Sequence, residues 1–156
     1  MIWTDTSSAV SAETPHVAPR EAALILNPAD RCQIETLPKA ARNLVEEHLT
    51  RWNLASLIDD AKVVASELVT NAVQYAPCTA VGFALRYAEG ALRIEVEDDS
   101  SEDPMLRQAN GYEEHGRGLQ LVGHLSHRWG FHRNGSGTKT TWCLFDTSSA
   151  VGSNQD

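Results

Sequence analysis

The feature that most constrains the fold is a change in the spacing of apolar residues near the middle of the chain. They first recur every three or four positions, at Leu57, Ala61, Val64, Leu68, Ala72 and Tyr75. This spacing is typical of one buried face of an α-helix. They then fall on every second position, at Val81, Phe83, Leu85 and Tyr87 and again at Leu92, Ile94 and Val96. Because such alternation is typical of half-buried strands, we expect a long helix followed by a β-hairpin that turns at Glu89-Gly90.

The elements on either side follow from the same two periods and from turn residues. A first helix is expected where Leu37, Ala41, Leu44 and Trp52 recur at helical spacing. The other expected elements are a strand at 22–26, a helix from Leu119 to about His127, and strands near 128–132 and 138–145 that flank the turn Asn134-Gly135-Ser136-Gly137. This order predicts an α/β (α+β) two-layer sandwich, in which a mixed, mostly antiparallel sheet carries the helices on one face.

The length of 156 residues fits one domain with its own core. Residues 1–20 and 146–156 are rich in small and polar residues and show no sustained apolar period. We therefore expect a disordered N-terminal tail over 1–20, a folded domain over 21–145 and a flexible C-terminal tail over 146–156.

The charge balance restricts the partners. The chain has 21 acidic residues against 13 Lys and Arg, a net charge of −8, which disfavours direct binding to nucleic acid or to an anionic membrane. The longest apolar run, Ala22 to Leu26, is far short of the roughly 20 residues that span a bilayer, and no signal peptide is recognisable. Cys32, Cys78 and Cys143 form no CxxC pair, so we expect reduced, mostly buried thiols in a cytoplasmic protein.

Two polar residues border the apolar stripe of the long helix. Glu67 and Asn71 are four residues apart and therefore neighbours on one helix surface. A carboxylate and a carboxamide oxygen at the edge of a core suit the binding of a hydrated Mg²⁺ or the orientation of a nucleophile. The alternative is a partly exposed helix flank without chemistry.

Asp98 falls on an unusual position of its strand. Counting by twos from Leu92 through Ile94 and Val96 places Asp98 on the same apolar face. A carboxylate there is costly unless hydrogen bonds are donated to it, and the exocyclic amine of a nucleobase is one such donor. The alternative is that the strand frays one residue earlier and Asp98 caps the turn.

Glycines mark two further candidate segments. Gly116-Arg117-Gly118 stands immediately before the third expected helix. Glycines allow close backbone approach and a helix N-terminus favours anions, so this segment suits a phosphate; the alternative is a hinge. Gly137-Thr138 precedes the last expected strand, and a turn also explains it.

Taken together and in this order, these segments resemble the motifs of the GHKL (histidine-kinase-like) ATPase superfamily. Glu67-Leu68-Val69-Thr70-Asn71-Ala72 resembles its N box, and the strand end at 95–98 resembles the one that bears its adenine-reading aspartate. The segment 116–122 resembles its second glycine box, and Gly137-Thr138 its last Gly-Thr element. The resemblance covers about 21–145.

Within that superfamily the segment 65–73 is similar to the anti-sigma-factor serine kinases. This resemblance implies ATP and Mg²⁺ as cofactors, and it implies two protein partners, a sigma factor and an anti-anti-sigma protein of the STAS type. It implies that Asn71 is a Mg²⁺ ligand and that Glu67 is the general base toward an acceptor serine. A homodimer is a further arrangement that the resemblance leaves open.

The resemblance also implies roles at the nucleotide. Asp98 would accept a hydrogen bond from the adenine amine. Gly116 and Gly118 would form the base of the lid over the phosphates, and Arg117 would add positive charge. Thr138 matches the Gly-Thr element, a role that passes to Thr140 if the alignment shifts.

One departure from the family pattern divides the functional hypotheses. The family's first glycine box follows the aspartate with glycines, whereas here Asp98 is followed by Asp99-Ser100-Ser101-Glu102. The lost glycines restrict the backbone conformations of this segment. The first hypothesis is an ATP-dependent serine kinase that sequesters a sigma factor. The second is a non-catalytic interaction module, with or without nucleotide.

Overall fold

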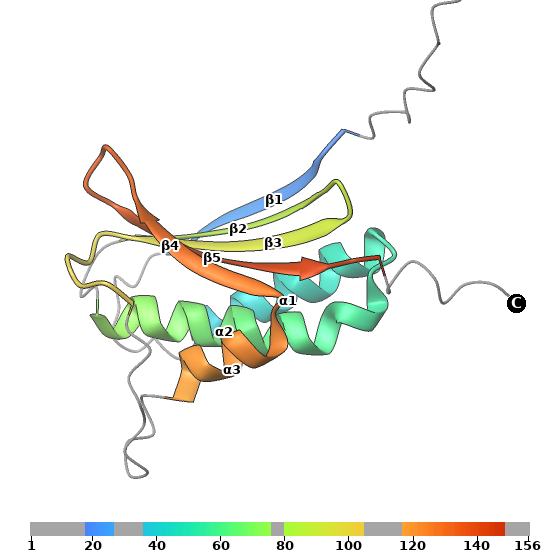
Figure 1. Ribbon diagram of the computed structural model, residues 1–156, viewed down its shortest axis with the longest axis horizontal. Helices are drawn as coiled ribbons and strands as arrows, with labels where there is room; N and C mark the ends of the chain where they lie inside the picture. Colours follow the sequence, from blue (N-terminus) through green and yellow to red (C-terminus); the bar gives the residue numbers. More distant parts are fainter. Residues whose placement is uncertain (1–17, 27–35, 76–79, 105–116, 149–156) are drawn as a thin grey trace, which may run out of the picture.

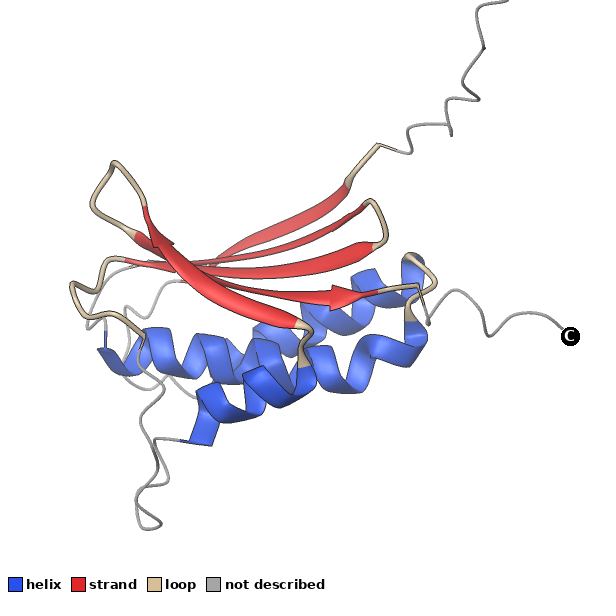
Figure 2. Ribbon diagram, viewed as in Figure 1, coloured by secondary structure: helices blue, strands red, loops and turns tan. Residues whose placement is uncertain are grey.

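The computed structural model describes residues 18–26, 36–75, 80–104 and 117–148. In chain order its elements are β1 (Arg20–Leu26), α1 (Thr36–Arg51), the short 3-10 helix η2 (Ala55–Leu57), α2 (Ile58–Tyr75), β2 (Val81–Ala88), β3 (Ala91–Asp98), α3 (Arg117–Leu125), β4 (Arg128–Arg133) and β5 (Lys139–Asp146). The strands form one layer and the helices α1, α2 and α3 cover one of its faces (Figures 1 and 2). The expected order of elements and the two-layer α+β architecture are confirmed.

The sheet has five strands in the order β1-β2-β3-β5-β4. Every pairing within the described residues is antiparallel, so the expected mixed character is not seen there. The predicted hairpin joins β2 to β3, and Glu89 and Gly90 adopt φ angles of 52° and 75°. Two consecutive left-handed residues are what a tight hairpin turn requires. Placement of β5 between β3 and β4 brings the chain's last strand beside the strand that ends in Asp98.

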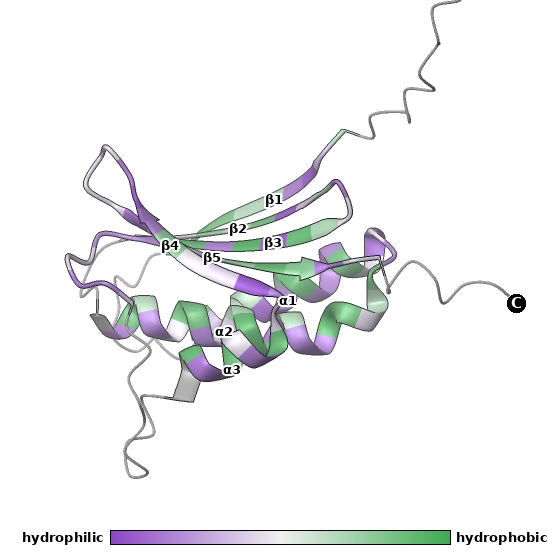
Figure 3. Ribbon diagram, in the orientation of Figure 1, coloured by the Kyte–Doolittle hydropathy of each residue, from purple (hydrophilic) through white to green (hydrophobic). Residues whose placement is uncertain are grey.

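The core lies between the sheet and the helices. The predicted stripe of α2 is confirmed for Ala61, Val64, Leu68 and Ala72, which are all buried. Leu57, predicted as its first member, belongs to η2 and is half-buried. α2 packs against α1 on one side and α3 on the other. The strands contribute alternate residues, among them Phe83, Leu85, Leu92, Ile94, Val96, Cys143 and Phe145. Figure 3 shows this alternation as green and purple segments along the strands.

The predicted thiol character is confirmed for Cys143, which is free and fully buried. Burial raises the pKa of this thiol to about 12. Cys32 and Cys78 lie outside the described residues. Within the described part of the chain, none of the helices has both the length and the apolar character needed to cross a bilayer.

Several predicted boundaries are corrected by one or two residues. Arg20 and Asp146, expected in the tails, belong to strands because they pair with Tyr87 and Ala91 respectively. α3 ends at Leu125, before the predicted His127, because the His127 backbone N–H already donates to the Leu144 carbonyl of β5.

Candidate functional site

The site begins on the exposed edge of α2. Glu67 and Asn71 lie one helical turn apart, and both are half-buried beside the buried residues Leu68 and Ala72. Their expected position at the border of the core is therefore where the structure places them. Among the described residues, none forms a hydrogen bond or ion pair with either side chain. The two side chains thus present oxygens that the described part of the protein does not occupy.

The carboxyl of Glu67 is more basic than that of an ordinary surface glutamate. Burial raises the pKa of its carboxyl above the usual value of 4.5. It lines a groove of about 520 Å³ between α1 and α2, together with Arg42, Asp59, Lys62, Val63 and Ser66. The two cations of this groove have partners other than Glu67. Arg42 donates to the Ser66 hydroxyl at 2.6 Å, and Lys62 pairs with Glu46 at 3.0 Å. A carboxylate of raised pKa is a better proton acceptor near neutral pH.

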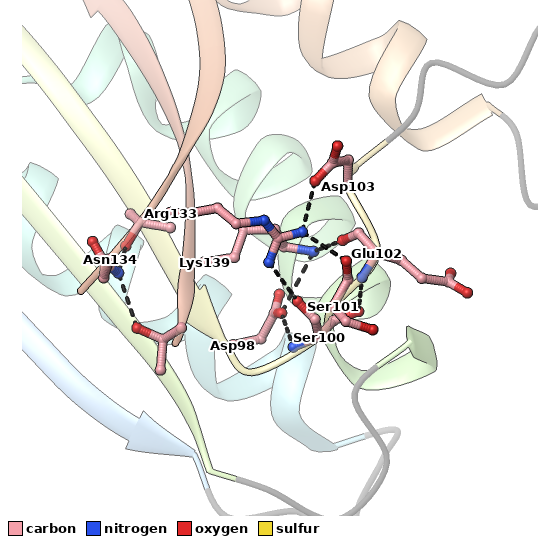
Figure 4. A network of polar contacts seen from close by, with 10 residues as sticks. Asp98, Ser100, Ser101, Glu102, Asp103, Arg133, Asn134 and Lys139 are labelled. Carbon is pink, nitrogen blue, oxygen red and sulfur yellow. Dashed lines mark hydrogen bonds and ion pairs between the residues drawn. The ribbon is translucent and has the colours of Figure 1, made fainter. Parts of the chain in front are cut away.

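Asp98 lies on the buried face of β3, as predicted from its parity. Its side chain is 4% exposed. The alternative is wrong in its first part, since the strand does not fray before Asp98. Its second part is confirmed, because the Asp98 carboxylate caps the turn that follows. The Asp98 Oδ1 atom accepts a hydrogen bond from the Ser100 backbone N–H at 2.8 Å and lies 3.5 Å from the Lys139 Nζ atom (Figure 4). The buried carboxylate therefore obtains its partners from the protein itself.

Lys139 is a residue of this site that the sequence analysis missed. Its side chain is only 6% exposed, and its ammonium group also donates to the Glu102 carbonyl at 2.8 Å. The signal was present in the sequence: counting back by twos from Phe145 and Cys143 through Thr141 places Lys139 on the buried face of β5. The pairing of Asp98 with Lys139 then gives a buried ion pair.

Arg133 is the second missed residue. It donates to the carbonyls of Ser100 and Ser101 at 3.1 and 2.8 Å and to the Asp103 Oδ1 atom at 2.6 Å (Figure 4). Arg133 and Lys139 together hold residues 99–103, which we call loop 99–103. This loop occupies the place in the sequence where the family's first glycine box stands. Hydrogen bonds from cations therefore fix a segment that lacks glycine.

Thr138 is held in the turn before β5. Its hydroxyl accepts a hydrogen bond from the Asn134 Nδ2 atom at 3.0 Å and shares another with the Ser136 hydroxyl. Asn134 also donates to the hydroxyl of Thr140, the alternative candidate. Gly137 has a φ of 89°, so a left-handed residue is required within the predicted turn. The residue between the two threonines, Lys139, is the one that faces Asp98.

The segment that resembles the second glycine box is only partly described. Gly116 lies outside the described residues, and only the backbone of Arg117 and Gly118 is described. Arg117 begins α3, so these two residues form its first turn and do not precede the helix as predicted. The free N–H groups of a first helical turn favour anions, which keeps the expected phosphate contact physically reasonable.

The donor set fits the expected nucleotide and metal in part. Within the residues that the structure describes, no three His, Cys, Asp or Glu side chains gather into a metal site. Mg²⁺ keeps several waters and needs few protein oxygens, so the unoccupied carboxamide of Asn71 suits it. Asp98 is different, because its Oδ1 atom already has two partners, the Lys139 ammonium group and the Ser100 N–H.

A family model matches most of the chain, and a solved structure is similar to it. The family model described as "Histidine kinase-like ATPase domain" matches residues 32–144. No curated protein matches the chain. Among solved structures, a chain of "The crystal structure of SiaB-SiaC complex from Pseudomonas aeruginosa" is similar at 18% identity and a TM-score of 0.45, covering 78% of this chain and 88% of that one. Because the family match spans well over half of the sequence and includes Glu67, Asn71, Asp98 and Thr138, the chain belongs to the histidine kinase-like ATPase domain family, a type of domain that binds ATP.

Proposed function

We propose that this protein is an ATP-dependent serine kinase of the anti-sigma-factor type. In this proposal it phosphorylates a serine of a STAS-type anti-anti-sigma partner and sequesters a sigma factor in the bacterial cytoplasm. Membership of the ATPase domain family supports ATP binding. The single observation that carries the catalytic part is on α2: Glu67, a carboxyl of raised pKa, lies one turn from Asn71, and neither has a partner among the described residues.

Each residue has a stated task in this proposal. ATP would supply the γ-phosphoryl group, and Mg²⁺ would neutralise the charge on that group. The Asn71 carboxamide oxygen holds the metal in place. The Glu67 carboxylate accepts the proton of the serine hydroxyl as the serine oxygen bonds to phosphorus and ADP leaves. The first turn of α3, which includes Arg117 and Gly118, would donate its free N–H groups to the phosphates. The catalytic contribution of the protein is thus mainly positioning plus one proton transfer.

The test combines labelled ATP with a STAS-domain protein and two variants. Glu67→Gln should keep its affinity for ATP with Mg²⁺ and lose phosphate transfer by about 100-fold or more, since it cannot accept the proton. Asn71→Ala should lose the Mg²⁺-dependent part of ATP affinity. Glu47→Gln and Asn43→Ala, both exposed on α1, are matched controls that should change neither property.

The outcome that contradicts the assignment is specific. If both site variants retain ATP affinity and transfer, Glu67 and Asn71 do not form the site. Transfer is measured as label on the partner, and binding is measured by calorimetry with and without Mg²⁺.

A second candidate is a non-catalytic protein-interaction module, with or without nucleotide. It is favoured by loop 99–103, which Arg133 and Lys139 hold in place without glycines, and by the contacts of the Asp98 Oδ1 atom with Lys139 and Ser100. In this case the protein holds its partner without modifying it. The same experiment separates the two candidates, because the module binds ATP or its protein partner and leaves the partner unlabelled.

Analytical ultracentrifugation of the protein alone tests the homodimer.

A further inference from the structure

Three charged side chains form a row across the sheet at the end where β3 finishes. Lys139 of β5 is the backbone partner of both Asp98 on β3 and Arg133 on β4. The three therefore lie side by side at one level of three adjacent strands, and they face the same side of the sheet as Val96 and Thr141. Figure 4 shows their side chains converging on loop 99–103.

Apart from the Asp98–Lys139 ion pair, the contacts described for the row go to this one loop. Arg133 donates to two of its carbonyls and to Asp103, and Lys139 donates to the carbonyl of Glu102. In the other direction, the backbone N–H of Ser100 in the loop donates to Asp98. Hydrogen bonds from charged donors are stronger than neutral ones. Cations from β4 and β5 thus tie the loop to the sheet over most of its length.

This arrangement closes off the Asp98 carboxylate. The side chains of Asp98 and Lys139 are 4% and 6% exposed, so little of either is open to solvent. The amine of a purine can contact Asp98 only after Lys139, the loop, or both have moved. Arg133 is the accessible member of the row, since its side chain is 40% exposed.

We propose that loop 99–103 is a latch over Asp98, held shut by Arg133 and Lys139, which must release before a purine base reaches that carboxylate. The identity of the incoming group as a purine rests on the proposed function. If the latch is shut in most molecules, the apparent affinity equals the affinity of the open form multiplied by the fraction of molecules that are open. Nucleotide binding is then coupled to the order of this loop.

The first test weakens the latch without touching Asp98. Arg133→Gln removes the guanidinium group that holds Ser100, Ser101 and Asp103, and it should tighten the Kd for ATP with Mg²⁺ by about three-fold or more, as expected if at least two-thirds of the molecules are latched. Asp103→Asn, which removes an exposed partner of Arg133, should act in the same direction to a smaller extent. Arg128→Gln is the matched control: it is exposed on the same strand and should leave Kd unchanged.

The second test follows the loop directly. Amide hydrogen exchange at Ser100 and Glu102, whose N–H groups donate within the latch, should become faster in the wild-type protein when ATP binds. Slower or unchanged exchange contradicts release, whatever the affinities.

The outcomes separate the latch from the proposed function. If the wild type binds ATP and neither Arg133→Gln nor Asp103→Asn binds it more tightly, the latch is wrong and ATP binding stands. If the wild type and both folded variants all fail to bind ATP, both proposals fail. Tighter binding in both variants together with faster exchange supports the latch.

Discussion

Glu67 differs from the other carboxylates of α2 in the amount of protein around it. Asp59 and Asp60 are exposed in the first turn of the helix, whereas Glu67 lies half-buried two turns later. Burial disfavours the charged form, and the pKa of Glu67 rises accordingly. The sequence placed Glu67 at the border of the apolar stripe, but it did not show how much of the side chain the fold covers. The chemistry of this residue therefore follows from packing that only the fold supplies.

This raised pKa has a consequence for stability. A carboxyl whose pKa is higher in the folded state favours folding below the unfolded pKa, near 4.5, and loses that contribution as the pH rises through the folded pKa. Glu67→Gln removes the effect. The free energy of unfolding of Glu67→Gln, minus that of the wild type, should therefore increase between pH 4 and the folded pKa and then level off.

Urea denaturation at a series of pH values measures this difference. Glu47→Gln removes an exposed carboxylate from α1 and controls for the loss of one negative charge. A difference between Glu67→Gln and the wild type that falls as the pH rises contradicts the assigned direction.

At the scale of elements, the apolar pattern and the turn residues were sufficient to predict α1, α2, α3, the strands β1 to β5 and the side on which Asp98 lies, but not the short helix η2. They did not show which strands are neighbours. β5 lies between β3 and β4, and this placement alone brings Lys139 beside Asp98 and Arg133. Counting by twos places Lys139 on the buried face of β5, just as it places Asp98 on the buried face of β3. To predict the ion pair, however, one must also know that these two strands are neighbours. The partner of the buried carboxylate was therefore sought in a ligand, whereas the neighbouring strand provides it.

The pairing of these strands predicts an asymmetric response to mutation. Lys139→Met leaves the Asp98 carboxylate buried without its cation, and removal of one member of a buried ion pair costs about 3–5 kcal/mol. The double variant Asp98→Asn with Lys139→Met removes both charges and should recover most of that loss. Lys62→Met breaks the more exposed pair with Glu46 and should cost at most about 1 kcal/mol.

Chemical denaturation of the four proteins at one pH provides the comparison. A loss below about 1 kcal/mol for Lys139→Met is inconsistent with a buried pair at this position. A double variant less stable than Lys139→Met leads to the same conclusion.

For the whole molecule, the fold class followed from the sequence, whereas the site followed only in part. Glu67, Asn71 and Asp98 occupy the faces expected of them, because helical and strand periods determine faces. Thr138 is held within its turn, and Gly116 lies outside the described residues. Arg133 was not recognised because its contacts depend on the path of loop 99–103. The loop is neither helix nor strand, so the spacing of its apolar residues does not predict that path. Family membership indicates ATP as the ligand of this domain, and the assignment of these residues to it belongs to the proposed function.

The most direct test of the account is the thermal unfolding of the wild-type protein with and without ATP and Mg²⁺. A ligand at 100 times its Kd adds about 2.7 kcal/mol to the free energy of unfolding. For a domain of this size that corresponds to a rise in Tm of about 5–10 °C. The account predicts such a rise with ATP and Mg²⁺ and a clearly smaller one when EDTA removes the metal. An unchanged Tm at millimolar ATP and Mg²⁺ would contradict it.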